Sequence, residues 1–341
     1  MSLSYRTRRT LVRLGKAAIA LTVIAILAWL CWIIWVGRYI VYTPNGAKLD
    51  FSLGPIPAGV EAVPPANLPD VQIYYNEPEL DITPPVVEKT SIQGYYIDFE
   101  DLKTDISAVK AKLEALPSGT AVMLDVKSIK GYFHYSTTVG KTTSKDVDIA
   151  QMDGLIQYLA NSNLHAIARI PAFRDWEFGL HNVPSGLPKK GGNGSLWMDD
   201  SNCYWLDPTA DKALDYLMRI TIELRSLGFD EVVYTDFRFP NTDKIIFDGD
   251  KYQALANAAA RLADECTTDR FCVSFMSASP DFPLPEGNCR VYLQDVAAAD
   301  AETIAQQVPT DDPKLHVLFM TTVNDTRFNE YCVLRPLDSA H

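Results

Sequence analysis

A carboxylate and a guanidinium stand two residues apart in the segment 228–240, whose sequence is GFDEVVYTDFRFP. Residues 231–235 form a short, mostly apolar run of β-forming residues, which predicts a strand buried on both faces. Asp236 and Arg238 follow it directly, and side chains two apart in extended chain project to the same side. We therefore expect the pair to meet one ligand at the carboxyl end of this strand, where α/β barrels and open α/β sheets carry their chemistry. A structural ion pair at a barrel rim is the alternative interpretation.

Charged residues also follow other predicted strands. The sequence predicts strands at 94–98, 121–126, 165–170, 271–276, 291–293, 316–320 and 331–334. If these strands share one sheet direction, their carboxyl ends bring together Asp98, Asp125, Lys127, Arg169 and Asp295. Buried charges must be paired, so a set of charged strand ends favours a functional site over a packing role. A helix cap for Asp98 and a solvated loop charge for Lys127 remain alternatives.

The elements that must position these residues alternate along the chain. Helical periodicity predicts helices at 102–116, 149–159, 207–227 and 252–263, whereas the Pro-rich segment 277–288 predicts none. Eight strands interleaved with helices over about 250 residues are typical of a (β/α)8 barrel of the TIM type, an α/β fold. An open doubly wound sheet is the alternative, but no Gly-rich phosphate loop follows the first strand.

Aromatic residues and carboxylates gather in the long loop after the third predicted strand. Phe173, Asp175 and Trp197 are the candidate ligand contacts in this loop. Flat rings stack on the C–H faces of sugars, and carboxylates accept hydrogen bonds from their hydroxyl groups. Trp197 is the strongest candidate because it follows the flexible sequence GGNG at 191–194. A small aromatic core within the loop is the alternative, particularly for Trp205 and its neighbour Tyr204.

The motifs LDVK, IARIPAFRDW, LWMDD, WLDP and GFDEVVYTDFRFP occur in this order. Together they resemble a bacterial family of predicted glycoside hydrolases with a TIM-barrel domain, over about residues 94–240. The resemblance implies a carbohydrate substrate rather than a defined reaction. It points to Asp125, Lys127, Arg169, Asp175, Trp197, Asp236 and Arg238. The later segments FCVSFMSA and VYLQDVAAAD depart from the family pattern, since they lack its aspartate, Pro-Met and Tyr-Pro-Ser features.

Glycoside hydrolysis needs two carboxyl groups, which lie ~5 Å apart in retaining enzymes and ~6.5–9.5 Å apart in inverting ones. We expect Asp236 to be the ionised partner, because Arg238 nearby would hold its pKa down. Asp125 is the expected acid, with Asp295 and Asp98 in reserve. The sequence leaves the choice between retention and inversion open.

Lys127 and Arg169 are expected to orient hydroxyl groups or to bind an acidic sugar. The expected partner is a polysaccharide or oligosaccharide, and we expect no cofactor. Two functions remain open: a glycoside hydrolase, and a carbohydrate-binding barrel without catalytic activity.

The amino-terminal residues predict a membrane anchor. Residues 17–36 carry no charge and follow five basic residues within 1–16. Twenty residues of helix span roughly 30 Å, the thickness of a bilayer core. The basic flank favours a cytoplasmic tail at 1–16 and an extracellular remainder. A cleaved signal peptide is the alternative, but the sequence after Trp35 is a poor cleavage site, so we expect a single-pass anchor in the cell membrane.

Nine prolines between residues 41 and 90 disfavour regular helix and predict a semi-rigid stalk or strap over 37–90, with an edge strand possible at 71–75. The barrel domain is then expected to occupy 91–341.

The charge of the chain beyond the predicted anchor argues against two classes of partner. Six of the 31 basic residues lie within 1–38, which leaves 25 against all 43 acidic residues, a net charge of −18. Nucleic acids and anionic lipid surfaces both require a basic face, so neither is an expected partner of this part.

Cysteine spacing suggests one disulfide bond. Cys266 and Cys272 are close enough in sequence to join a helix end to the next strand, and Cys289 with Cys332 is a weaker pair. Cys203 would then be left over. The sequence contains no CxxC pair and no HExxH motif, so we expect no structural zinc site.

Overall fold

The computed structural model describes residues 21–32, 35, 40–43, 46–49 and 91–340. The chain divides into two compact units, Met1–Leu80 and Asp81–His341. In the first unit, residues 21–32 and 35 are helical. Strands β1 (Ile40–Thr43) and β2 (Gly46–Leu49) pair antiparallel, a hairpin that the sequence analysis did not predict.

The predicted membrane span and stalk lie largely beyond what the structure describes. Residues 17–20, 33–34 and 36 of the span, and residues 50–90 with the predicted edge strand, are outside the described residues. Among the described residues, no helix has the length and apolar character needed to cross a membrane.

The second unit is a closed barrel of eight parallel strands, in the order β10-β3-β4-β5-β6-β7-β8-β9. The strands are β3 (Gln93–Tyr96), β4 (Ala121–Asp125), β5 (His165–Pro171), β6 (Glu231–Thr235), β7 (Cys272–Ser277), β8 (Val291–Gln294), β9 (Val317–Met320) and β10 (Cys332–Pro336). All eight fall where the sequence predicts strands. The (β/α)8 barrel is therefore confirmed, and the open doubly wound sheet is excluded.

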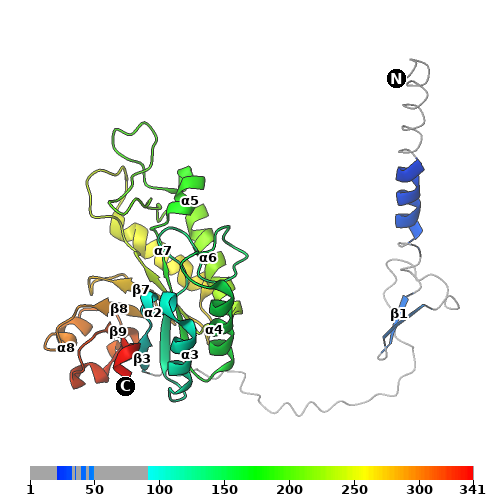
Figure 1. Cartoon of the computed structure of the whole chain (residues 1–341). Helices are drawn as coiled ribbons and strands as arrows, with labels where there is room; N and C mark the ends of the chain where they lie inside the picture. Colours follow the sequence, from blue (N-terminus) through cyan, green and yellow to red (C-terminus); the bar gives the residue numbers. More distant parts are fainter. Residues whose placement is uncertain (1–20, 33–34, 36–39, 44–45, 50–90, 341) are drawn as a thin grey trace, which may run out of the picture. The chain divides into compact units, whose positions relative to one another are not determined.

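Helices cover the outside of the barrel (Figure 1). They are α2 (Phe99–Thr104), α3 (Ile106–Glu114), α4 (Ile149–Asn161), α5 (Trp176–His181), α6 (Asp211–Ser226), α7 (Lys251–Cys266), α8 (Ala301–Ala305) and α9 (Pro313–His316). Short 3-10 helices follow at Val183–Ser185, Thr326–Glu330 and Leu337–Ala340. The helices between β8 and β10 are short, whereas α4, α6 and α7 span three to four turns.

Two helices differ from the prediction for local reasons. The predicted helix 102–116 is divided at Asp105, which has extended backbone dihedrals and accepts a hydrogen bond from the Ala108 N–H at 3.0 Å. An N-cap residue adopts this conformation, so a new helix starts there. The helix predicted from 207 begins at Asp211, because the Asp207 side chain first accepts a hydrogen bond from the Thr209 N–H at 2.8 Å in a turn.

Each strand separates an outer core from an inner one. In β4, Val122 and Leu124 pack outward with residues of the surrounding helices, whereas Ala121 and Met123 pack inside the barrel. The same alternation explains why the predicted Cys266–Cys272 disulfide bond is wrong. Both thiols are free, because Cys266 lies in the outer core while Cys272 contacts Ser274 and Arg290 inside the barrel.

The predicted disulfide bond between Cys289 and Cys332 is also absent. Cys332 is a free thiol whose Sγ accepts a hydrogen bond from the Ile92 N–H at 3.4 Å. Cys203, the predicted leftover thiol, is free and buried.

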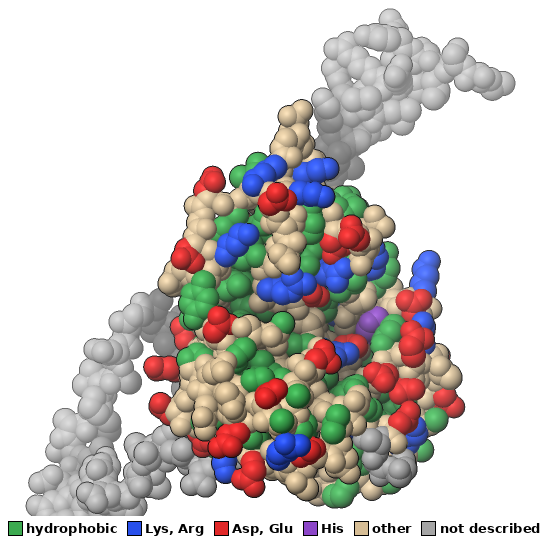
Figure 2. Space-filling view, turned by 90° about the vertical axis from the view of Figure 1, so that its left-hand side faces the viewer, with side chains coloured by type: hydrophobic (Ala, Val, Ile, Leu, Met, Phe, Trp, Pro, Cys, Tyr) green, Lys and Arg blue, Asp and Glu red, His purple; other side chains and the backbone are tan. Residues whose placement is uncertain are grey.

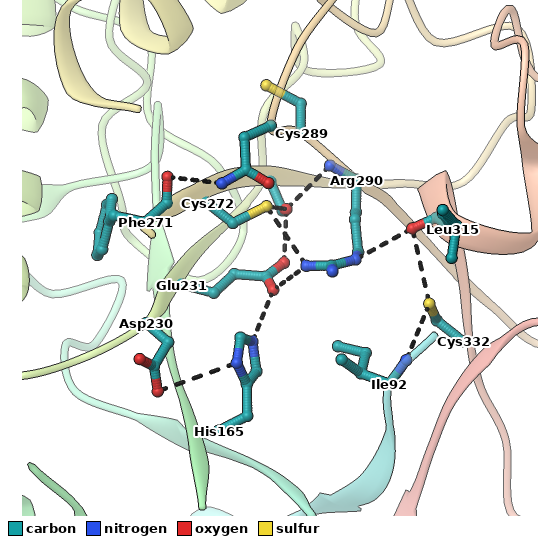
Figure 3. A network of polar contacts seen from close by, with 12 residues as sticks. Ile92, His165, Asp230, Glu231, Phe271, Cys272, Cys289, Arg290, Leu315 and Cys332 are labelled. Carbon is teal, nitrogen blue, oxygen red and sulfur yellow. Dashed lines mark hydrogen bonds and ion pairs between the residues drawn. The ribbon is translucent and has the colours of Figure 1, made fainter. Parts of the chain in front are cut away.

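A buried ion-pair network fills the barrel at the amino ends of the strands (Figure 3). Glu231, the first residue of β6, is fully buried, and its Oε2 lies 2.6 Å from Arg290 Nη1 and 3.2 Å from His165 Nε2. Its Oε1 accepts hydrogen bonds from Ser274 Oγ at 2.6 Å and from Tyr292 Oη at 2.8 Å. This end of a TIM barrel serves stability, so we assign the network a structural role.

Candidate active site

A cavity on the opposite rim has a volume of about 610 Å³, within the usual range for ligand sites. Its walls come from the carboxyl ends of β5, β6, β7 and β8. They are formed by Arg169, Thr235, Asp236, Arg238, Met276, Ser277, Ala278, Gln294 and Asp295. Four predicted site residues thus share one cavity. A face of the barrel unit is hollowed near its middle, with basic and acidic side chains at the edge of the hollow (Figure 2).

Asp125 and Arg169 form a two-armed ion pair at the ends of the neighbouring strands β4 and β5, where the two residues are directly opposite in register. Arg169 Nε lies 2.5 Å from Asp125 Oδ1, and Nη2 lies 2.7 Å from Oδ2. Burial would lower the pKa of Arg169, but the hydrogen bonds to Asp125 outweigh it and raise this pKa. Both oxygens of Asp125 thus accept hydrogen bonds from one guanidinium, which fixes the orientation of the two side chains.

Asp236 follows β6 directly and has a left-handed backbone, with φ of +50°. Its side chain is 17% exposed, and its Oδ1 lies 3.8 Å from Arg238 Nη2. Burial raises the pKa of Asp236, and the nearby Arg174 and Arg238 only partly oppose the rise. The prediction that Arg238 would hold this pKa down is therefore wrong, because desolvation outweighs a guanidinium at that distance. Asp236 is the carboxyl group of this cavity that is suited to carry a proton.

Asp295 occupies the equivalent place after β8, and it shares the left-handed conformation, with φ of +56°. Non-glycine residues rarely adopt this conformation, and they concentrate at functional sites when they do. Asp98 follows β3 and is exposed at the start of α2, where its side chain makes no capping hydrogen bond. Burial raises the pKa of Tyr96, and the charges of Asp98 and Asp295 raise it further. Asp98 and Asp295, which follow β3 and β8, therefore lie on the same rim of the barrel.

Three predicted ligand contacts are buried behind the cavity. Lys127 Nζ lies 2.7 Å from Asp175 Oδ2, and neither side chain is exposed. Asp175 also caps α5 by accepting a hydrogen bond from the Phe178 N–H at 2.7 Å. Phe173 is fully buried against Phe237, with ring centroids 4.7 Å apart. Lys127 forms part of the wall of a further cavity that adjoins the first, whereas Phe173 and Asp175 lie in the wall of none of the cavities described here.

Trp197 lies at a second cavity of about 320 Å³, next to the first. Its ring packs 6.4 Å from the buried Trp205, over which Arg238 lies at 4.8 Å. Asp199 binds Arg174 Nε at 2.6 Å and Trp205 Nε1 at 3.0 Å through its Oδ2. The sequence analysis did not select Arg174 and Asp199, although both lie in the motifs IARIPAFRDW and LWMDD. Trp205 belongs to the small aromatic core that was the alternative for this loop.

A third cavity of about 250 Å³ adjoins the first on its other side. His134 lines it and packs against Phe99 with the two rings tilted and their centroids 4.4 Å apart. Burial lowers the pKa of His134 to about 4, so its imidazole is neutral near pH 7. The sequence analysis missed His134 because it lies in the loop after β4, outside every predicted strand and helix.

Comparison with known proteins agrees with the resemblance seen in the motifs. Residues 104–270 match the family model described as "Putative glycosyl hydrolase domain", which confirms that resemblance. No match was found among curated proteins.

Several solved structures are similar to the barrel unit. A hypothetical protein from Ruminiclostridium thermocellum is 22% identical, and the alignment covers 53% of this chain and 96% of that one, with a TM-score of 0.43. The GH20 exo beta-N-acetylglucosaminidase from Vibrio harveyi, as an inactive D437A mutant, is 9% identical over 73% of this chain and 50% of its own, with a TM-score of 0.49. The glycoside hydrolase domain of PelA from Pseudomonas aeruginosa is 14% identical over 73% of this chain and 96% of its own, with a TM-score of 0.42.

Proposed function

We propose that the barrel hydrolyses a glycosidic bond in a carbohydrate, since residues 104–270 match the family model described as "Putative glycosyl hydrolase domain". The observation that carries the proposal is the pairing of Asp236 with Asp295 in one cavity. One is a buried carboxyl group whose pKa is raised, and the other is an exposed carboxyl group across the cavity. Two carboxyl groups in different surroundings are what this chemistry requires.

In the proposed reaction, Asp236 is the general acid. Burial raises its pKa above that of an ordinary aspartate, which suits a group that donates a proton to the leaving glycosidic oxygen. Asp295 is the partner that activates a water molecule, since it is open to solvent on the other wall. This assignment replaces the expected use of Asp125 as the acid.

We propose that the two carboxyl groups act with inversion of the anomeric centre. β6 and β8 are separated by β7 alone, so their backbones are roughly 10 Å apart. That spacing leaves room for a water molecule between two carboxyl groups, as in inverting enzymes, where they are ~6.5–9.5 Å apart. Arg169 uses Nε and Nη2 to hold Asp125, and its Nη1 remains to donate hydrogen bonds to a sugar hydroxyl group.

The membrane anchor is a further part of the proposal. We propose that residues 17–36 hold the protein in the cell membrane, with residues 1–16 cytoplasmic and the barrel acting on a cell-wall or extracellular polysaccharide. The uncharged run and its basic flank support this arrangement. Protease added to intact cells should then remove the barrel, and protection of the barrel in sealed cells would contradict it.

The release of reducing ends from a polysaccharide panel tests the reaction. Asp236→Asn should lower kcat about a hundredfold or more, because no other group supplies the proton. Its Tm should change by a few degrees at most, since the side chain keeps its shape. Asp243→Asn, in the exposed part of the following loop, is the matched control and should leave activity unchanged. Full activity of Asp236→Asn would contradict the assignment, and sugar binding without turnover by the unaltered protein would favour a carbohydrate-binding barrel.

A further inference from the structure

We propose that the three cavities form one groove that binds successive units of a sugar chain, so that the enzyme cuts within the chain rather than removing a terminal unit. This proposal rests on the proposed function and adds the position of cleavage, within the sugar chain and not at its end. It also assigns a distal subsite, at Trp197 and Trp205, to a sugar unit that lies away from the bond being cut.

Shared wall residues set the order of the cavities. The central cavity and the aromatic cavity both include Arg238 in their walls. The central cavity and the one at His134 both include Arg169 and Thr235. The two outer cavities share no wall residue, so the central one, with Asp236 and Asp295, lies between them. A terminal-unit enzyme needs a site closed at one end, whereas this site continues in both directions.

The aromatic cavity has the chemistry of a sugar subsite. Trp197 is partly exposed and presents a flat apolar ring for the C–H face of a pyranose, and it packs against the buried Trp205. Arg238 lies over Trp205 at 4.8 Å, and its side chain is 51% exposed. Its described contacts are a hydrogen bond to Phe239 O at 3.2 Å and the ion pair with Asp236. Because Arg238 belongs to the walls of both cavities, the other N–H groups of its guanidinium can donate to hydroxyl groups at their junction.

The aromatic wall is held in place before any ligand binds. The Trp197 N–H donates to Leu187 O at 2.9 Å, and the Leu187 N–H donates to Trp205 O at 2.8 Å. Gly191 and Gly194 make the tight end of this loop with positive φ values of 68° and 88°. A preformed wall avoids the entropy cost of ordering side chains on binding. The loop therefore behaves as a fixed part of the groove.

The cavity at His134 completes the groove on the other side. Phe99 and His134 pack against each other, with their rings tilted, in its wall. The neutral imidazole offers hydrogen bonding without charge, as suits a sugar hydroxyl group. The groove thus offers a flat ring on each side of the two carboxyl groups.

The experiment measures binding and cleavage separately. Calorimetry with Asp236→Asn uses cellulose-, chitin- and starch-derived oligosaccharides, each from disaccharide to hexasaccharide. We expect the affinity for the preferred series to rise with length. Trp197→Ala in the same background should lower the hexasaccharide affinity about tenfold more than the disaccharide affinity, the effect of one stacked ring. Tyr252→Ala, an exposed ring on α7 that lines none of the three cavities, is the control and should change neither.

A second variant covers the case in which Trp197→Ala does not fold. Ser201→Gln lengthens an exposed side chain in the wall of the aromatic cavity without touching its rings, and it should weaken hexasaccharide binding selectively. Equal affinities for all lengths, or variants without a length-dependent effect, would overturn the groove.

Product analysis with the unaltered protein distinguishes failure of the groove proposal from failure of the proposed glycoside hydrolase function. Early release of products of intermediate length supports internal cleavage, whereas monosaccharide alone overturns it and leaves glycoside hydrolysis intact. If nothing is cleaved, the proposed reaction fails, and the binding series still decides whether the groove exists.

Discussion

Replacing Glu231 by glutamine tests the role of the buried network at the amino ends of the strands. Burial alone would raise the pKa of Glu231, but the charge of Arg290 and the contact with His165 outweigh it and lower the pKa to about 2. Relative to an ordinary value of 4.5, this corresponds to about 3 kcal/mol at ~1.4 kcal/mol for each pKa unit. Loss of one partner of a buried ion pair costs ~3–5 kcal/mol in general, and the two figures agree.

Glu231→Gln should therefore lower the free energy of unfolding by about 3 kcal/mol, measured by urea denaturation near pH 7. For a domain of this size the fall in Tm is about 6–12 °C. Glu330→Gln makes the same chemical change in the exposed pair with Lys314, and it should leave Tm nearly unchanged.

The pH dependence gives a second readout. A carboxyl group whose pKa is lower in the folded state stabilises the fold above its unfolded pKa and loses this contribution as the pH falls. The contribution of Glu231 should be complete above about pH 4.5 and decline towards pH 2. The difference in stability between the unaltered protein and Glu231→Gln should shrink over that window. A loss below ~1 kcal/mol at pH 7, or a difference that does not depend on pH, would refute the structural role.

Three further predictions address the rim and the thiols. Asp175→Asn should cost ~3–5 kcal/mol in the free energy of unfolding, because it leaves the Lys127 ammonium buried beside a neutral amide; a loss within ~0.5 kcal/mol in urea denaturation would contradict the pair. Asp295→Asn should lower kcat about a hundredfold with little change in KM, and a rise in KM alone would make Asp295 a binding residue. Added reductant should leave the Tm of the barrel unchanged, since Cys266 and Cys272 are free thiols, and a fall of several degrees would show a disulfide bond.

The strands could be predicted because their signal is local. Runs such as AVMLDV and EVVYT are apolar, short and bounded by charge or proline, and their alternation with helices leads directly to a barrel. The same pattern also predicts which residues lie at the carboxyl ends of the strands. Arg169, Asp236 and Asp295 therefore share a cavity, as expected.

The state of each side chain could not be predicted, because it depends on contacts between distant segments. Lys127 and Asp175 are charged residues in a loop sequence, yet together they are fully buried. The surroundings of Asp236 and Asp125 could not be predicted for the same reason. Burial of the first and the two-armed contact of the second with Arg169 arise only when the barrel closes.

The left-handed backbones of Asp236 and Asp295 have a consequence for engineering. Glycine adopts such a conformation without steric cost, so replacement by glycine would relieve strain at both positions. A laboratory selection for heat resistance alone would therefore favour glycine at both positions, since stabilising changes often conflict with activity at strained sites. A thermostable derivative of this protein should be sought with both aspartates held fixed, and with the selection directed at the helices on the outside of the barrel.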